Sequence, residues 1–184
     1  MSEAHVHVDP SNKKVALFIA VLALVLAFAE TLGKGSQTGA LASHIEASNL
    51  WAFFQAKTIR QTTVRTAAEE MEAQFGNRAP EAVKKQVESW KKTAERYQSE
   101  PETNEGRKEL MARAKEMEKK RDRAMAAYHN YEIASAAVQI AIVLASAQII
   151  TGVAALLWIA YALGAIGVAF SLIGFFWPTA VHLF

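Results

Sequence analysis

Residues 133–177 read IASAAVQIAIVLASAQIITGVAALLWIAYALGAIGVAFSLIGFFW, without a single Asp, Glu, Lys or Arg. These 45 residues are too many for one membrane-crossing helix, which takes about 20 apolar residues, and suit two helices joined by a turn. Glycine ends helices at little cost, so the break is predicted at Thr151-Gly152. The sequence therefore predicts a hairpin of two transmembrane helices, at residues 133–150 and 153–177.

A third apolar run lies near the N-terminus, where residues 15–29 read VALFIAVLALVLAFA. Together with residues 30–32 at the interface, it is long enough to cross a bilayer, so a first span is predicted at 15–32. A cleaved signal peptide is the alternative, but the Glu-Thr-Leu-Gly-Lys sequence that follows is a poor cleavage site. We expect residues 1–14 to form a flexible tail and residues 178–184 a short one.

Charged residues are concentrated between the first and second apolar runs. Of the 20 Lys and Arg, 18 lie between Lys34 and Arg123. They are interleaved with acidic residues, and the formal net charge is only +2, so we predict no nucleic-acid partner. The absence of Cys excludes disulfides and thiolate chemistry. The pattern predicts an all-α integral membrane protein with a charged, helical, coiled-coil-like extramembrane domain at residues 33–132.

This domain shows three helical stretches in which apolar residues recur at steps of four and three. Gly76 is the predicted end of the first, Pro80 opens the second, and residues 99–104 break it. The third runs into the second span without Gly or Pro. Polar residues interrupt the apolar spacing, which favours a wet or oligomeric interface over a dry monomeric core; they are Lys57, Gln61 and Arg121.

The connectivity of this domain carries a geometric constraint. It leaves and re-enters the membrane on the same side, whereas three helices joined by two reversals would end pointing away from the bilayer. The second helix could extend or cap the first. Part of the first, residues 41–54, could instead lie flat on the membrane, with burial against neighbouring helices an equal alternative.

Polar and small residues within the spans are candidates for helix–helix packing or an oligomer interface. Ser135, Gln139 and Ser146 share one face of the second span, and a continuous row of small residues follows the third. An alternative is that the polar face lines a pore, although no charged residue lies in mid-membrane. Glu30, at the interface, is expected to pair with Lys34. The small residues are Ala160, Gly164, Gly167, Ser171 and Gly174.

The sequence carries little that points to catalysis or ligand binding. His5 and His7 alternate, which is a weak metal-binding signal, and no metal or cofactor site is predicted. The glycines of residues 33–39 lack the preceding strand and the Lys-Ser/Thr ending of a phosphate loop. Neither a catalytic triad spacing nor a small-molecule substrate site is evident, so an enzyme is not expected.

Residues 47–62 read ASNLWAFFQAKTIRQT and resemble a family of bacterial membrane proteins known as a domain of unknown function, number four-three-three-seven. The resemblance extends to Gly33-Lys34-Gly35 and to residues 139–146. It implies a bacterial inner-membrane protein with this three-span layout, and no activity. The turn after Thr151 has no charged residue and in this differs from the family, in which a basic residue is expected there. The family-motif or interfacial residues are Asn49, Leu50, Trp51, Phe53, Phe54, Lys57 and Arg60.

Orientation and function follow as hypotheses. Lys119, Lys120, Arg121 and Arg123 precede the second span, while the turn after it has no positive charge, which places the charged domain in the cytoplasm and the N-terminus outside. Besides the lipid bilayer, the expected partners are further copies of the chain or a larger membrane complex. We expect a homo-oligomeric scaffold or accessory subunit; a solute-conducting assembly is the alternative.

Overall fold

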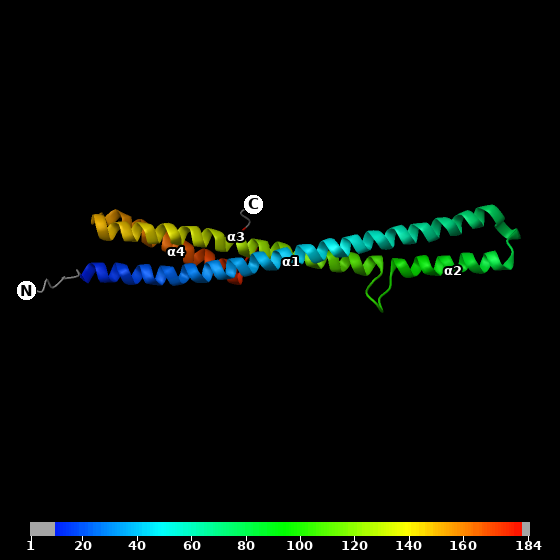
Figure 1. The fold of residues 1–184 in the computed structure, drawn as a ribbon, viewed down its shortest axis with the longest axis horizontal. Coiled ribbons are helices and arrows are strands. Elements are labelled where there is room, and N and C mark those ends of the chain that lie inside the picture. Colours follow the sequence, from blue (N-terminus) through cyan, green and yellow to red (C-terminus); the bar gives the residue numbers. More distant parts are fainter. Residues whose placement is uncertain (1–9, 182–184) are drawn as a thin grey trace, which may run out of the picture. The chain divides into compact units, whose positions relative to one another are not determined.

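The computed structural model describes residues 10–181, and every regular element within them is helical. The elements are α1 (Pro10–Phe75), the short 3-10 helix η1 (Gly76–Arg78), α2 (Glu81–Gln98), α3 (Arg107–Thr151) and α4 (Ala154–Phe176) (Figure 1). Among the described residues, α1, α3 and α4 are long and apolar enough to cross a membrane. The prediction of an all-α protein with three such helices is confirmed. His5 and His7, in the predicted tail, lie outside the described residues.

The helix ends fall where the sequence places its helix-breaking residues. Gly76 follows α1 with a φ of +49°, and Gly152 follows α3 with a φ of +71°. Glycine adopts this left-handed conformation without the steric cost that a Cβ imposes, so both positions end helices readily. Pro80 directly precedes α2 and Ser99 directly follows it. These predicted breaks are confirmed, as is the continuity of the third stretch with the second span in α3.

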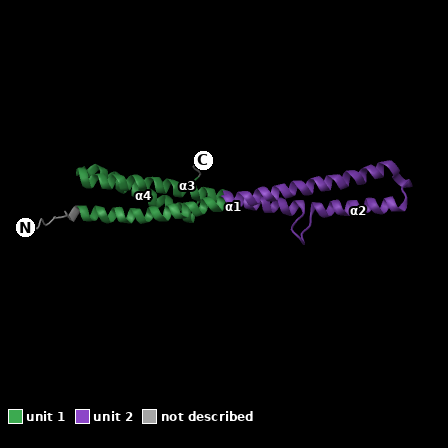
Figure 2. Cartoon of the chain, viewed as in Figure 1, with its two compact units in different colours: residues 1–40, 122–184 green, residues 41–121 purple. Residues whose placement is uncertain are grey.

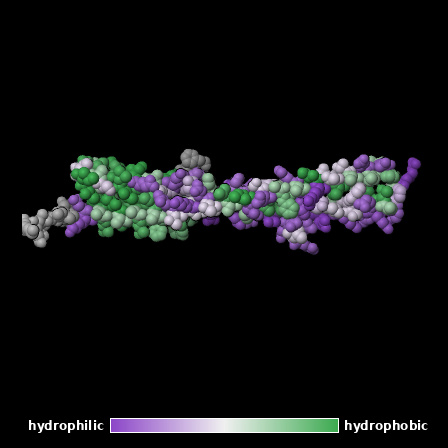
Figure 3. Space-filling model, viewed as in Figure 1, coloured by the Kyte–Doolittle hydropathy of each residue, from purple (hydrophilic) through white to green (hydrophobic). Residues whose placement is uncertain are grey.

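The chain divides into two compact units (Figure 2). Unit 1 comprises residues 1–40 and 122–184, and unit 2 comprises residues 41–121. Helices α1 and α3 each contribute residues to both units. Figure 3 shows hydrophobic residues over much of the visible surface of unit 1 and mostly hydrophilic residues over that of unit 2.

Unit 1 packs the first part of α1, the second part of α3 and α4 around small and branched side chains. Its core contains Val15 and Leu22 from α1, Val138 and Ala141 from α3, and Ala160 from α4. Much of its outer surface is also apolar, because large apolar side chains point outward from all three helices. Such a large exposed apolar surface is what contact with a bilayer requires. The exposed residues include Leu17, Val21, Leu24, Phe28, Ile140, Val143, Ile150, Trp158 and Phe175.

Unit 2 pairs α1 with two helices in succession. The end of α1 packs against α2, where Lys91 forms an ion pair with Glu72 at 2.6 Å. Nearer its middle, Leu50 of α1 packs on Leu110 and Ala114 of α3. Within unit 2, α2 and the start of α3 therefore run in the same direction along α1, which satisfies the geometric constraint found in the sequence.

Residues 41–54, for which a flat interfacial helix was one alternative, belong to the uninterrupted helix α1. Leu50 is buried, and three aromatic side chains next to it pack on the same cluster of α3 residues. Burial against a neighbouring helix, the other alternative, therefore describes these four residues. The aromatic residues are Trp51, Phe53 and Phe54.

Candidate functional site

The polar stripe predicted on the second span comes together only in part. Gln139 of α3 donates its side-chain amide to Ser135 Oγ at 3.1 Å and to Glu30 Oε1 of α1 at 3.2 Å. Glu30 and Gln139 are exposed and Ser135 is half-buried. We call Glu30, Ser135 and Gln139 the polar patch. Among the described residues Glu30 forms no ion pair with Lys34, so that predicted partner is wrong and Gln139 takes its place.

Ser146 lies apart from the polar patch. Its hydroxyl donates to the carbonyl oxygen of Ile142 at 2.8 Å, within its own helix, and the residue is half-buried. Serine commonly satisfies its hydroxyl in this way inside apolar helices. Gln148, which the sequence reading passed over, has a buried side-chain oxygen without a hydrogen-bond partner.

The small residues of α4 face the other two helices of unit 1. A Cβ added to Gly164 would lie 3.0 Å from Leu22 Cδ2 of α1. One added to Gly167 would overlap Val138 of α3 and lie 3.0 Å from the Ala134 carbonyl oxygen. Close approach of this kind is how membrane helices gain packing contacts. In this small-residue seam Ala160, Gly164, Gly167 and Gly174 are buried, and Ser171 is half-buried and donates to the Gly167 carbonyl oxygen at 2.9 Å.

Asn130 is a buried polar residue of unit 1 that the sequence reading missed. Its side chain is 1% exposed and its amide donates to the carbonyl oxygens of Pro178 at 3.0 Å and Ala126 at 2.9 Å. Its Oδ1 atom has no partner. Gly174 of α4 packs directly against it, since an added Cβ would lie 3.2 Å from Asn130 Cβ. The available signal was an uncharged polar side chain at the entry to a predicted span.

The most elaborate polar cluster lies in unit 2, where α2 ends and α3 begins. Lys57 of α1 is 6% exposed, and its ammonium lies 3.4 Å from Glu100 Oε2 and 3.8 Å from Glu105 Oε2. The same ammonium lies over the rings of Phe53, at 5.5 Å, and Tyr97, at 5.3 Å. Aromatic faces and carboxylates both stabilise a cation that has lost most of its water. This lysine is therefore fully partnered within the chain.

Arg107, the first residue of α3, completes this cluster. It donates to Thr58 Oγ1 and to Gln98 Oε1, each at 2.9 Å, and also to Gln61 Oε1. Its guanidinium lies over the Phe54 ring at 5.1 Å from the centroid. We call Lys57, Gln61, Glu100 and Arg107 the junction site, because they join α1 to the end of α2 and the start of α3.

Glu109 fastens the segment between α2 and α3. Its carboxylate accepts hydrogen bonds from Ser99 Oγ at 2.6 Å and from the backbone N–H of Glu100 at 3.1 Å. The hydrogen bond from Ser99 is the main reason that the pKa of Glu109 lies below its usual value of 4.5; the backbone bond from Glu100 adds to it. The segment is thus held at its start by α3 itself.

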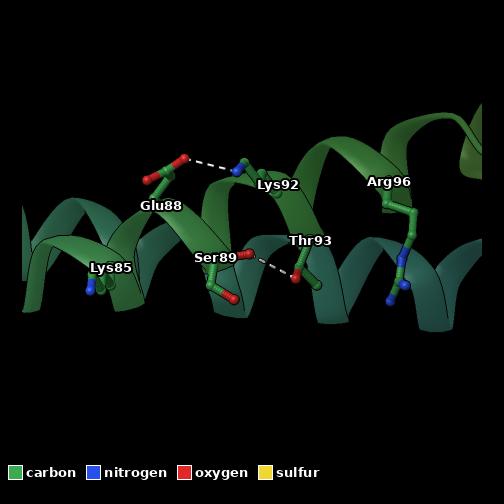
Figure 4. Close-up of a pocket in the computed structure, with 6 residues that line it drawn as sticks. All are labelled: Lys85, Glu88, Ser89, Lys92, Thr93 and Arg96. Carbon is green, nitrogen blue, oxygen red and sulfur yellow. Dashed lines mark hydrogen bonds and ion pairs between the residues drawn. The ribbon is translucent and has the colours of Figure 1, made fainter. Parts of the chain in front are cut away.

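The outer face of α2 carries a second group of polar side chains (Figure 4). Lys92 pairs with Glu88 at 2.8 Å, and Thr93 Oγ1 donates to the Ser89 carbonyl oxygen at 2.9 Å. The hydrogen bond from Lys92 lowers the pKa of Glu88. Both members of this ion pair are well exposed, so we interpret the face as a solvated helix surface. Across residues 10–181 no three His, Asp or Glu side chains gather as metal ligands.

The family-motif residues divide between the two sides of α1. Those on the inner side build the unit 2 core and the junction site, and Trp51 Nε1 donates to Glu118 Oε1 at 2.9 Å. Asn49 and Arg60 are exposed. Residues 47–62 thus provide all the α1 residues in the contacts with the start of α3 described above.

Comparisons with known proteins give the family and nothing more specific. No curated protein and no solved structure matches the chain. A family model described as a domain of unknown function, DUF4337, matches residues 11–177, which is nearly the whole chain. By this match the chain belongs to the DUF4337 family.

Proposed function

We propose that the protein is a homo-oligomeric membrane scaffold or accessory subunit of a membrane complex, with unit 1 in the bilayer. The observation that carries the proposal is the polar patch. Glu30 and Gln139 are exposed beside the apolar runs of α1 and α3, at positions that belong to the spans predicted at residues 15–32 and 133–150. Exposing a carboxylate and a carboxamide at the edge of the hydrocarbon region is costly, and polar side chains in spans usually face another helix.

A second copy of the chain would cover this patch with complementary groups. Both N–H groups of Gln139 are donated within the chain, so the patch offers a partner the Ser135 hydroxyl as donor and the Gln139 and Glu30 side-chain oxygens as acceptors. Two copies related by a twofold axis could exchange hydrogen bonds through these groups. Among residues 10–181 the Glu30 carboxylate accepts one hydrogen bond, from Gln139, which leaves acceptor capacity for a partner. The small-residue seam, by contrast, is already occupied by contacts within the chain.

The extramembrane charges also support a scaffold. The ionic and amide groups of the junction site bond to one another, so they fix geometry and offer no free acid or base. We infer that no reaction takes place there. The charge asymmetry described above favours unit 2 in the cytoplasm, and the family resemblance implies a bacterial inner membrane, so we propose this location and orientation.

Native mass spectrometry of the full chain, purified from its own membranes in mild detergent, tests this proposal. We expect a discrete oligomer, and Gln139→Leu should lower its abundance. Thr31→Val is the matched control, because the Thr31 hydroxyl is exposed in the same unit but donates only to Ala27 of its own helix. A monodisperse monomer without any co-purifying protein would reject the scaffold.

A solute-conducting assembly is the second candidate, and the polar patch is again the observation that favours it. Polar groups exposed on the outside of one copy could line a path between several copies. Flux measurements on liposomes that contain the purified oligomer distinguish the two candidates. Conduction that Gln139→Leu abolishes supports a channel, whereas absence of flux with the wild-type protein rejects it.

A further inference from the structure

The outer face of α1 in unit 2 carries an exposed row of uncharged residues. Six positions follow one another at steps of four and three, and all six are exposed. Leucine and isoleucine occupy three of them, with exposures of 59%, 52% and 67% for Leu41, Ile45 and Ile59. We call this row the outer stripe; it comprises Leu41, Ile45, Ser48, Ala52, Gln55 and Ile59.

The outer stripe lies opposite the face of α1 that packs within the chain. Leu50 and Lys57, which are buried against α2, α3 and the connecting segment, are half a helical turn away from it. The stripe therefore has no role in the packing of unit 2. In a soluble helix an apolar row at alternating steps of four and three is the pattern of a second helical interface.

The charge distribution shows what kind of partner this row suits. Residues 41–59 contain two charged residues, Glu46 and Lys57, whereas residues 60–121 contain 27. Neither of the two belongs to the outer stripe. In a parallel contact between identical helices each residue faces its own copy, so any charge in the row would meet the same charge. An uncharged row in a highly charged unit is thus complementary to itself.

We propose that the outer stripe binds the outer stripe of a second copy, as a parallel pair of α1 helices; the proposal rests on the homo-oligomer proposed above and names its extramembrane contact. Copies anchored with the same sidedness direct α1 the same way, so matching residues lie at equal heights above the membrane. Anchoring also raises the effective concentration of one stripe around another. A small contact area between the two stripes is therefore sufficient for them to pair.

The residues of the outer stripe form layers with distinct roles. Leu41, Ile45 and Ile59 provide apolar layers at both ends of the row, and Ala52 allows close approach in the middle. Ser48 and Gln55 can hydrogen-bond to their own copies across the pair. Isolated polar layers of this kind fix register and orientation in helical coiled coils at some cost in stability.

Cysteine cross-linking in native membranes tests the contact directly, because the chain has no cysteine of its own. Ser48→Cys should form a homodimeric disulfide on mild oxidation, since facing layers bring the Cα atoms within the roughly 4–7 Å that a disulfide spans. Glu46→Cys is the matched control. It is exposed on the same helix two residues away but points off the stripe, and it should form little dimer. Equal cross-linking of the two variants would overturn the proposal, as would a Ser48→Cys cross-link to a different protein.

The double variant Ile45→Glu/Ile59→Glu adds a thermodynamic measurement. Both side chains are exposed in the single chain, so the fold of that chain, measured as its helix content, should remain that of the wild type. Like charges in two facing layers should weaken dimerisation of the full chain in detergent by at least about tenfold. If the wild type is oligomeric and the double variant dissociates no more readily, the outer stripe is not the contact, although the homo-oligomer stands. If the wild type is monomeric, both proposals fail.

Discussion

The side-chain amide of Asn130 donates a hydrogen bond to the carbonyl oxygen of Pro178 across 3.0 Å, and so ties α3 to the chain just beyond α4. The last carbonyl groups of a helix and the residues after it have no partners within the helix itself. Asn130 is 1% exposed, so water does not replace this bond. The end of α4 is therefore fixed by one buried amide and by the close contact of Gly174 beside it.

Replacing Asn130 by alanine should destabilise unit 1. The substitution removes the two hydrogen bonds that its amide donates and leaves the Pro178 carbonyl buried without a partner, at a cost of about 1–3 kcal/mol. Thermal unfolding in mild detergent, followed by circular dichroism, should show a melting temperature lower by about 2–10 °C. Asn49→Ala is the control, because Asn49 is exposed and alanine favours helices. Equal melting temperatures for both variants would contradict a structural role for Asn130.

The small-residue seam predicts opposite effects for two glycine substitutions. Gly167→Ala forces a Cβ against Val138 and the Ala134 carbonyl oxygen and should cost about 1–3 kcal/mol. Gly39→Ala, in α1, meets nothing within 4 Å and should stabilise the helix by up to about 1 kcal/mol. Melting temperatures of the two variants, measured together in the same detergent, should lie on either side of the wild-type value. An unchanged melting temperature for Gly167→Ala would mean that α4 can shift to accommodate the added methyl group without a loss of stability.

Local sequence features predicted the helices and their ends well. Gly76 and Gly152 end helices because glycine adopts a positive φ without steric cost. The run of residues 133–177 contains no charged residue, so its length and composition alone predict helices that can cross a membrane. The spacing of the glycines in α4 likewise indicates a close approach. It cannot reveal the helix that approaches, because Leu22, which faces Gly164, lies 142 positions earlier in the chain.

The polar contacts could not be predicted in the same way, because their partners are distant in sequence. Local spacing suggested Lys34 for Glu30, but Gln139, 109 residues away, donates to that carboxylate. Lys57 and Gln61 interrupt an apolar row in the sequence. The residues next to them do not show that Glu100 pairs with Lys57 or that Arg107 donates to Gln61. Asn130 was missed because one polar residue next to a charged segment gives no sign of burial.

Lys57→Met should destabilise unit 2 more than any exposed charge removal on α2. Methionine retains much of the buried stem but removes the cation that lies 3.4 Å from Glu100 and 3.8 Å from Glu105, and among the described residues leaves Glu100 paired only with the more exposed Arg96. Removing one partner of a fully buried ion pair costs about 3–5 kcal/mol, and partial exposure of the two carboxylates reduces our expectation to about 1–3 kcal/mol. Lys92→Met, which removes the exposed partner of Glu88, should leave the melting temperature unchanged. A similar loss in both variants would show that Lys57 contributes only as a surface charge.

The sidedness of the chain can be determined with single cysteines, because the sequence contains none. We expect Glu102→Cys, between α2 and α3, to be protected from a membrane-impermeant maleimide in intact cells and labelled after lysis. Val153→Cys, exposed in the turn between α3 and α4, should be labelled in intact cells. The reverse pattern would place unit 2 outside the cytoplasm and contradict the orientation inferred from the basic residues before the second span.

Glu109 should make the stability of unit 2 depend on pH in the acidic range. Hydrogen bonds from Ser99 and from the Glu100 backbone hold its pKa below 4.5 in the folded protein, whereas the unfolded chain titrates near that value. A depressed folded pKa means that the contribution is fully present above the unfolded pKa and is lost as the pH falls through the folded one. Glu109→Gln cannot ionise, so its melting temperature should fall less steeply than that of the wild type below about pH 4.5. Ser99→Ala, which removes the stronger bond and keeps the carboxylate, should give an intermediate slope. Identical acid dependence in all three proteins would show that Glu109 makes no pH-dependent contribution to folding.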